Sequence, residues 1–204
     1  GSKLAVALDD DNIIILILKT LKEAFRFQEK CVTSMCFNNE ALIYTTGSQK
    51  FLAAQWQHDL LSNGCSGTVC INELNGSNKR VLIKELSWPT GITFTGKTTF
   101  CISESWMHRI SFHKLSDDQS SASRLDKEIS KLPAYPGKSF FNSSNEELLV
   151  CFFAPRNQLV EFILTEEEYK TRMMAEIDPS LWVAPTYRSG KHIREPLQQS
   201  GIKT

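Results

Sequence analysis

The chain has 204 residues, 41% of them hydrophobic, which is enough to bury one sizeable core, so we expect a globular domain. Twenty-three basic residues balance 23 acidic ones, so no net field attracts nucleic acid or an anionic membrane. The longest apolar run, Ile13 to Leu18, is far shorter than the ~20 residues that cross a bilayer, and acidic residues precede it. We therefore expect no nucleic-acid partner, no membrane insertion by this chain and a cytoplasmic location.

Short β-branched and aromatic runs, bounded by clusters of Asn, Asp, Gly and Ser, predict strands along residues 4–164. Residues 48–61 are instead predicted to form a helix, and Asn63 and Gly64 are residues typical of a helix C-terminus. Residues 165–177 are a second predicted helix, with Thr165 as N-cap and Glu168 as its capping-box partner. We interpret both helices as short insertions or additions in an all-β fold.

The strand pattern repeats along the chain. Residues 81–103 and 127–153 share the order of short strand, aromatic residue and proline, strand, polar turn and strand, with Pro89 and Pro136 47 residues apart. A weaker copy at residues 32–47 aligns Thr33 with Thr90, and residues 4–18 have the same strand, turn and strand order. Repeats of about 40 to 45 residues are typical of β-propeller blades. A six-bladed ring needs roughly 240 to 270 residues, so this chain holds about four blades.

We therefore predict an all-β fold: a β-propeller of the six-bladed type, incomplete, with one or two inserted short helices. Residues 1–164 are expected to form the blades, and residues 165–204 a helix and an extended tail of the same domain. An open ring leaves blade faces uncovered. We expect exposed apolar faces around residues 13–18 and 159–164, and self-association through them.

The stretch 98–115 places Glu104, Trp106, His108 and Arg109 in one turn between two strands. We interpret it as a structural hairpin, in which Arg109 pairs with Glu104 and Trp106 caps the turn. A pocket-lining role and a catalytic role are the alternatives. Neither His108 nor His113 has a carboxylate or cysteine partner at a recognisable spacing, so we do not expect either to act as a base.

The cysteines predict reduced thiols rather than a disulfide framework. Four of them lie inside apolar, strand-like runs and are expected in the core: Cys36, Cys70, Cys101 and Cys151. Four residues separate Cys65 from Cys70, and four separate Cys31 from Cys36, which is not the spacing of a zinc knuckle. We expect no metal at either pair.

Several segments together resemble one propeller family. They are SGTVCINEL (66–74), WPTGITF (88–94), TFCISESWMHRISFHKL (99–115) and LPAYPGK (132–138). They are similar to the strictosidine synthase-like and gluconolactonase-like (senescence marker protein-like) six-bladed propellers. The similarity is closest to a bacterial subgroup with AAQWQ-x-DLL, SESW-x-HRI, FAPRNQLVEF and RMMAE, here at 53–61, 103–110, 153–162 and 172–176. It covers about residues 30–202 and implies that this chain is a fragment of a longer propeller.

The resemblance to the gluconolactonase branch implies a divalent metal held by a Glu, an Asn and an Asp. Thr90 stands at the Asn position and Gly137 at the Asp position, and neither supplies the amide or carboxylate oxygen. The early blade that carries the Glu has no match in this chain. We therefore expect no metal and no cofactor, and no metal-dependent lactone hydrolysis.

The resemblance to the strictosidine synthase branch implies a channel glutamate in a Gly-x-His-x-Glu stretch. Gly190 and His192 match, but Arg194 stands at the glutamate position and Glu195 follows it. An arginine neighbour keeps a carboxylate ionised, which suits an ion pair better than a general acid. Glu195 and His192 are therefore weak catalytic candidates, with a structural role preferred and ligand contact second.

Two classes of function follow. The first is a non-catalytic or degenerate propeller that binds a small polar metabolite, with the ABC-type permeases associated with this subgroup as an expected partner. The second is an enzyme, either a small-molecule hydrolase acting on a lactone or ester or a strictosidine synthase-like enzyme. The unmatched acid and metal-ligand positions favour the first class. The candidate ligand-binding residues are Thr90, Trp88, Tyr135, Trp56, Glu104 and Arg156.

Overall fold

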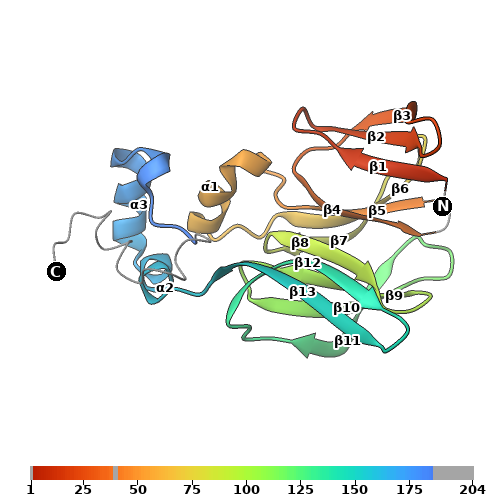
Figure 1. The fold of residues 1–204 in the computed structure, drawn as a ribbon. Helices are drawn as coiled ribbons and strands as arrows, with labels where there is room; N and C mark the ends of the chain where they lie inside the picture. Colours follow the sequence, from red (N-terminus) through yellow and green to blue (C-terminus); the bar gives the residue numbers. More distant parts are fainter. Residues whose placement is uncertain (1, 39–40, 186–204) are drawn as a thin grey trace.

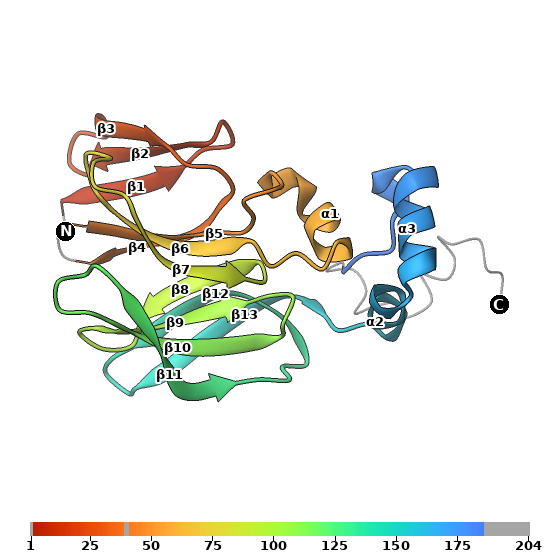
Figure 2. The ribbon, with the colours of Figure 1, turned by 180° about the vertical axis from the view of Figure 1, so that it is seen from behind.

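The computed structural model describes residues 2–38 and 41–185. In this part of the chain, antiparallel strands form four sheets, and short helices gather at one end of them (Figure 1). The reverse view in Figure 2 shows the same separation, with α1, α2 and α3 on the side away from the first residues of the chain.

Each sheet is a meander whose strands follow chain order. The first contains β1 (Lys3–Ala7), β2 (Asn12–Ile17) and β3 (Lys22–Gln28). The second contains β4 (Val32–Asn38), β5 (Ala41–Thr46), β6 (Gly67–Glu73) and β7 (Arg80–Leu86). The third contains β8 (Pro89–Phe94), β9 (Thr99–Glu104), β10 (Arg109–Leu115) and β11 (Ala122–Ile129). The fourth contains β12 (Ala134–Asn142) and β13 (Glu147–Pro155). Successive meanders of this kind are what the repeats predicted.

The first strands of the last three sheets lie next to one another, with β8 in contact with both β4 and β12. Two equivalent threonines link them. The Thr33 hydroxyl donates to the Pro89 carbonyl at 2.5 Å, and the Thr90 hydroxyl donates to the Pro136 carbonyl at 2.7 Å. The alignment of Thr33 with Thr90 from the sequence is therefore confirmed, and the same side-chain to backbone bond joins the second sheet to the third and the third to the fourth.

Apolar side chains fill the space between neighbouring sheets. One cluster joins the second and third sheets and includes Ile43, Val69, Ile71, Ile92, Phe100 and Ile102. A second cluster joins the first and second sheets and includes Ile13, Ile15, Leu42, Tyr44 and Cys70. Burial of one such side chain is worth about 1.5 to 3 kcal/mol, so these two layers hold the sheets face to face.

The expected exposed face at residues 13–18 is only partly present. Ile13 and Ile15 are fully buried, whereas Ile17 is 41% exposed. At the second expected face, residues 159–164, Phe162 is 58% exposed, and on the fourth sheet Phe140 is 62% and Leu149 is 57% exposed. Self-association through apolar faces stays a prediction.

Of the four cysteines predicted in the core, Cys70 and Cys101 are buried, and Cys31, which was not among the four, is buried as well. Burial raises the pKa of the Cys101 thiol to about 11. Cys36 is half-buried, and its pKa is raised to about 12 for the same reason. Cys151 is exposed, contrary to the prediction, because its side chain lies on the open face of the two-stranded sheet. All six thiols are free.

The helical part is larger than predicted. It contains η1 (Ala53–Gln55), α1 (Trp56–Leu61), α2 (Gln158–Thr165), α3 (Glu167–Glu176) and η2 (Pro179–Leu181). The strand predicted at residues 159–164 is wrong, because these residues form α2. The Asn157 side chain accepts the Leu159 N–H at 2.8 Å and caps the helix, and Val160 and Ile163 bury one face of it. No helix in the described ranges is long and apolar enough to cross a membrane.

The predicted helix ends were partly correct. Thr165 is the last residue of α2 rather than the N-cap of the next helix, so the proposed capping box with Glu168 is wrong. The stop signal after α1 is confirmed. Asn63 has φ 52°, its N–H bonds to the Leu60 carbonyl, and the Gly64 N–H bonds to the Asp59 carbonyl at 2.8 Å. These are the two bonds of a Schellman motif.

A substitution at Gly91 of β8 tests how closely β8 packs against β12, the first strand of the fourth sheet. A Cβ at this position would lie 2.5 Å from the Gly137 carbonyl oxygen, which is backbone and has little room to move. Gly91→Ala should therefore lower the free energy of unfolding by about 2 to 3 kcal/mol, measured by urea denaturation. Gly137→Ala is the matched control, because its Cβ would lie 3.3 Å from the Cys151 carbonyl. Equal losses in the two variants would contradict the close approach of β8 and β12.

Candidate functional site

Tryptophans gather at the end of the sheets that the helices cover. The chain has four, of which Trp56 begins α1, Trp88 lies between β7 and β8, and Trp106 lies in the β9–β10 turn. The Trp88 and Trp106 rings stack with centroids 5.4 Å apart, and the Trp56 and Trp106 centroids are 6.2 Å apart. Trp182, the fourth, packs against His58 of α1 at 4.5 Å. Trp56, Trp88 and Trp106 thus meet at one place, which we call the aromatic mouth.

A cavity of ≈ 370 Å³ opens at the aromatic mouth. Its described lining consists of Ala53, Trp56, Trp88, Thr90, Trp106, Phe153 and Pro185. Three indole rings and one phenyl ring therefore face a space of the size that small ligands occupy. None of these lining residues carries a formal charge.

Trp88 is held in an unusual backbone conformation. Its φ is 52°, which is unfavourable for a residue with a large side chain and costs of order 1 kcal/mol. The Trp88 carbonyl accepts the Ser105 N–H at 3.1 Å, and the ring lies over Gly47, where a Cβ would be 3.1 Å from it. Other described residues, such as Leu21 and Glu85, share this backbone conformation, and at Trp88 it accompanies a ring that lines the cavity.

A buried carboxylate lies behind the aromatic mouth. Asp59 of α1 is fully buried, and its Oδ1 accepts the indole N–H of Trp106 at 2.8 Å. Its Oδ2 has no hydrogen-bond partner within the described residues. After α1 the backbone passes close to this carboxylate. Position 64 therefore requires glycine, because a Cβ on Gly64 would lie 2.1 Å from the Asp59 carboxylate. The motif AAQWQ-x-DLL contains Asp59, and this motif was the only sequence signal for it.

Comparisons with known proteins agree with this architecture. No family model and no curated protein matches the sequence. Among solved structures, the chain is similar to one titled "Crystal Structure of Mitotic Checkpoint Complex" (TM-score 0.56, 11% identity, 74% of this chain and 43% of that chain). It is also similar to a luciferin-regenerating enzyme (TM-score 0.52, 10% identity, 76% of this chain and 53% of that chain). The chain has a β-propeller-type fold. It spans about half the length of these two structures, and the likeness concerns the fold alone.

Three of the six candidate ligand residues line the cavity of this propeller: Thr90, Trp88 and Trp56. Tyr135 lies next to it, with its ring 5.5 Å from Phe153 and 6.1 Å from Trp106. Phe153 lines the cavity although the sequence did not single it out, because an aromatic residue in a strand is usually a core residue.

The remaining two candidates, Glu104 and Arg156, are held in ion pairs and are not among the described lining residues. Glu104 Oε1 lies 2.7 Å from Arg109 Nε across the β9–β10 hairpin, as the structural interpretation predicted. Trp106 does not cap its own turn, since it stacks on Trp88 and lines the cavity, so the pocket-lining alternative holds for this residue. Arg156 Nη2 lies 2.6 Å from Glu161 Oε2.

His108 has a carboxylate partner that its local sequence does not reveal. Its Nε2 lies 3.3 Å from Glu161 Oε1, and Glu161 is on α2, far along the chain. Burial lowers the pKa of His108 below its ordinary value, and the nearby Arg156 charge adds to this. Burial would raise the pKa of Glu161, but its bonds to Arg156 and His108 outweigh it and lower the value. With Tyr135, whose hydroxyl is 3.5 Å from Glu161, these groups fasten α2 to the third and fourth sheets.

The residues compared with metal ligands have other partners. The Thr90 hydroxyl is 2.7 Å from both the Ser105 hydroxyl and the Pro136 carbonyl, and Gly137 has no side chain. In the part of the chain that the structure describes, no group of three His, Cys, Asp or Glu side chains could hold a metal ion. The weak catalytic candidates Glu195 and His192 lie outside the described residues.

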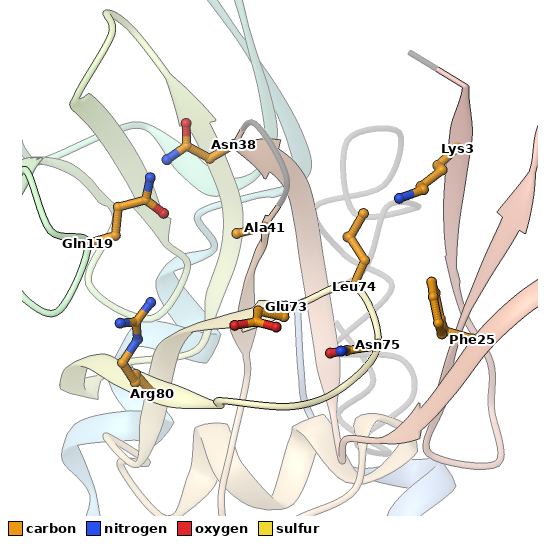
Figure 3. Close-up of a pocket in the computed structure, with 9 residues that line it drawn as sticks. All are labelled: Lys3, Phe25, Asn38, Ala41, Glu73, Leu74, Asn75, Arg80 and Gln119. Carbon is orange, nitrogen blue, oxygen red and sulfur yellow. The ribbon is translucent and has the colours of Figure 1, made fainter.

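A second cavity, of ≈ 490 Å³, lies at the opposite end of the sheets. Figure 3 shows Arg80, Asn38 and Gln119 along one side of it, and Lys3 and Phe25 along the other. Glu73, the one carboxylate among its described lining residues, accepts the Asn78 amide N–H at 2.6 Å and the Ser77 hydroxyl at 3.0 Å, and these bonds lower its pKa. This carboxylate is therefore engaged in ordering the β6–β7 turn rather than open to a ligand. For this reason the aromatic mouth is the better candidate site.

Proposed function

We propose that this chain is part of a strictosidine synthase-like and gluconolactonase-like propeller that binds a small molecule at the aromatic mouth without converting it. The observation that carries this proposal is the meeting of Trp56, Trp88 and Trp106 around a cavity of ≈ 370 Å³. Ring faces brought together from separate elements are typical of ligand sites, which are mostly apolar with few polar groups.

The lining chemistry favours binding over catalysis. A hydrolase acting on an ester or lactone needs a nucleophile or a general base within hydrogen-bond reach of its substrate. Among the described lining residues, only Thr90 carries a side-chain polar group besides the indoles, and its hydroxyl already bonds Ser105 and Pro136. The luciferin-regenerating enzyme supports only the point that such a fold can accommodate an enzyme. Hydrolysis is therefore the second candidate.

The proposed ligand is amphipathic rather than purely polar. A small polar metabolite was the expectation from the sequence, but indole faces bind apolar or cationic groups, so at least one such group belongs to the ligand. Association with an ABC-type permease remains part of the proposal, since a non-catalytic binding protein is a natural accessory to a transporter. Its support is the resemblance of AAQWQ-x-DLL and SESW-x-HRI to that bacterial subgroup.

A ligand screen with a site variant tests the proposal. Small molecules that change the intrinsic tryptophan fluorescence would be titrated by calorimetry into the wild-type chain and into Trp56→Leu. Loss of one indole wall should weaken binding about ten-fold. Phe140→Leu is the control, because this exposed aromatic side chain lies on β12 outside the cavity lining. Ligands that bind the wild type and Trp56→Leu equally would contradict the aromatic mouth as the site.

A further inference from the structure

The cavity lining narrows the chemical class of the ligand. Its described residues include no lysine or arginine, so an anionic group would lose its hydration without a partner. A sugar would need several donors and acceptors, and the Thr90 hydroxyl is already engaged. The described lining best suits two classes that bind ring faces without hydrogen bonds: flat apolar groups and alkylated cations.

Asp59 distinguishes between these two classes. Its carboxylate is fully buried directly behind Trp106 and accepts the indole N–H at 2.8 Å. A carboxylate at the N–H edge makes the indole ring more electron-rich, and a buried negative charge is weakly screened. No described ion pair involves Asp59, and its Oδ2 lacks a hydrogen-bond partner in the described ranges. Within the described part of the protein, this carboxylate therefore has no cationic partner, and a bound cation would supply one.

We propose that the aromatic mouth binds an alkylated ammonium group against Trp56, Trp88 and Trp106, with Asp59 as the counter-charge behind Trp106. This inference rests on the proposed function and specifies its ligand class. A fully alkylated ammonium fits better than a primary one, because a primary ammonium brings three N–H donors that need acceptors. The lining supplies ring faces in place of such acceptors, and ring faces are the known partners of quaternary ammonium groups.

Two probe molecules of the same shape, one charged and one neutral, separate the contribution of ligand charge to binding from that of apolar burial. Choline and 3,3-dimethylbutan-1-ol differ in one atom, the charged nitrogen or a neutral carbon. Calorimetric titration should give at least about ten-fold tighter binding of choline. Asp59→Asn keeps an oxygen acceptor for the Trp106 N–H and removes the charge. It should weaken choline binding several-fold and leave the neutral alcohol unchanged, which also reports that the cavity is intact.

A second variant keeps the test decisive if Asp59→Asn does not fold. Trp106→Phe retains a ring face but loses the N–H that joins it to Asp59, so it should reduce the preference for choline over the alcohol. Equal or tighter binding of the alcohol to the wild type would overturn the cation proposal, as would binding of neither probe. If other screened compounds then bind in a manner that Trp56→Leu weakens, the proposed function stands and only the ligand class is wrong. If no compound does, both are wrong.

Discussion

Replacing Arg109 with methionine should lower the free energy of unfolding by about 3 kcal/mol, because it leaves a buried carboxylate without its charge partner. The Glu104 side chain is 1% exposed, and its Oε1 lies 2.7 Å from Arg109 Nε. The Ser87 N–H at 3.2 Å and the Ser111 hydroxyl at 3.4 Å remain as donors, but neither carries a charge. Urea denaturation at neutral pH measures the loss.

Arg124→Met is the matched control for this experiment. Arg124 also pairs with a glutamate, Glu128, but 48% of its side chain is exposed, so the substitution should cost less than about 1 kcal/mol. The double variant Glu104→Leu/Arg109→Met removes both charges and should recover most of the stability lost in Arg109→Met. If Arg109→Met and Arg124→Met cost the same, the hairpin pair is not the buried anchor that the structure indicates.

The pH dependence of stability should show the burial of His113. Burial lowers its pKa from the ordinary 6.5 to about 4, with Arg124 as the next cause, Glu104 opposing and Arg109 adding to it. The ring is stacked on Phe100 at 5.5 Å and lies 3.0 Å from the Ser111 hydroxyl. Because the folded pKa is depressed, the unfolded chain binds the proton first. Stability from this group is therefore complete above pH 6.5 and falls as the pH drops toward 4, by about 3 kcal/mol.

The comparison variant is His113→Gln, which keeps a polar group near Ser111 and cannot titrate in this range. Its free energy of unfolding, measured in urea at several pH values, should fall less steeply than that of the wild type between pH 6.5 and 4. Carboxylates with lowered pKa values, such as Glu161 and Glu73, lose stability at lower pH in both proteins and cancel in the comparison. Parallel curves would show that the pKa of His113 is the same in the folded and unfolded chains, which would contradict the effect of its burial.

The sequence predicted those parts of the fold that depend on local pattern. The meanders, the hairpin with Arg109 opposite Glu104, and the equivalence of Thr33 and Thr90 all follow from strand alternation and repeat spacing. Helix α2 was missed because its short apolar run reads equally well as a strand. The Asn157 cap was the available signal.

The candidate site was only half predictable, for a different reason. Trp56, Trp88 and Thr90 were named from the sequence, yet nothing local shows that Trp106 contacts Asp59, 47 positions earlier, or that Phe153 completes the wall. Likewise, His108 contacts Glu161 only because α2 lies against the β9–β10 turn. Contacts that join separate sheets and helices depend on tertiary packing, and the residue spacing of a single sequence does not encode them.

The central claim is that the aromatic mouth binds a ligand, and indole NMR tests it most directly. The four tryptophans should give four indole N–H signals in a ¹H–¹⁵N spectrum, assigned through single Trp→Phe variants. During titration with choline, and with the best compound from the screen, the account predicts saturable shifts of the Trp56, Trp88 and Trp106 signals. It would be contradicted if these signals stayed fixed for every ligand that calorimetry shows to bind, while amides around Arg80 and Gln119 shifted instead.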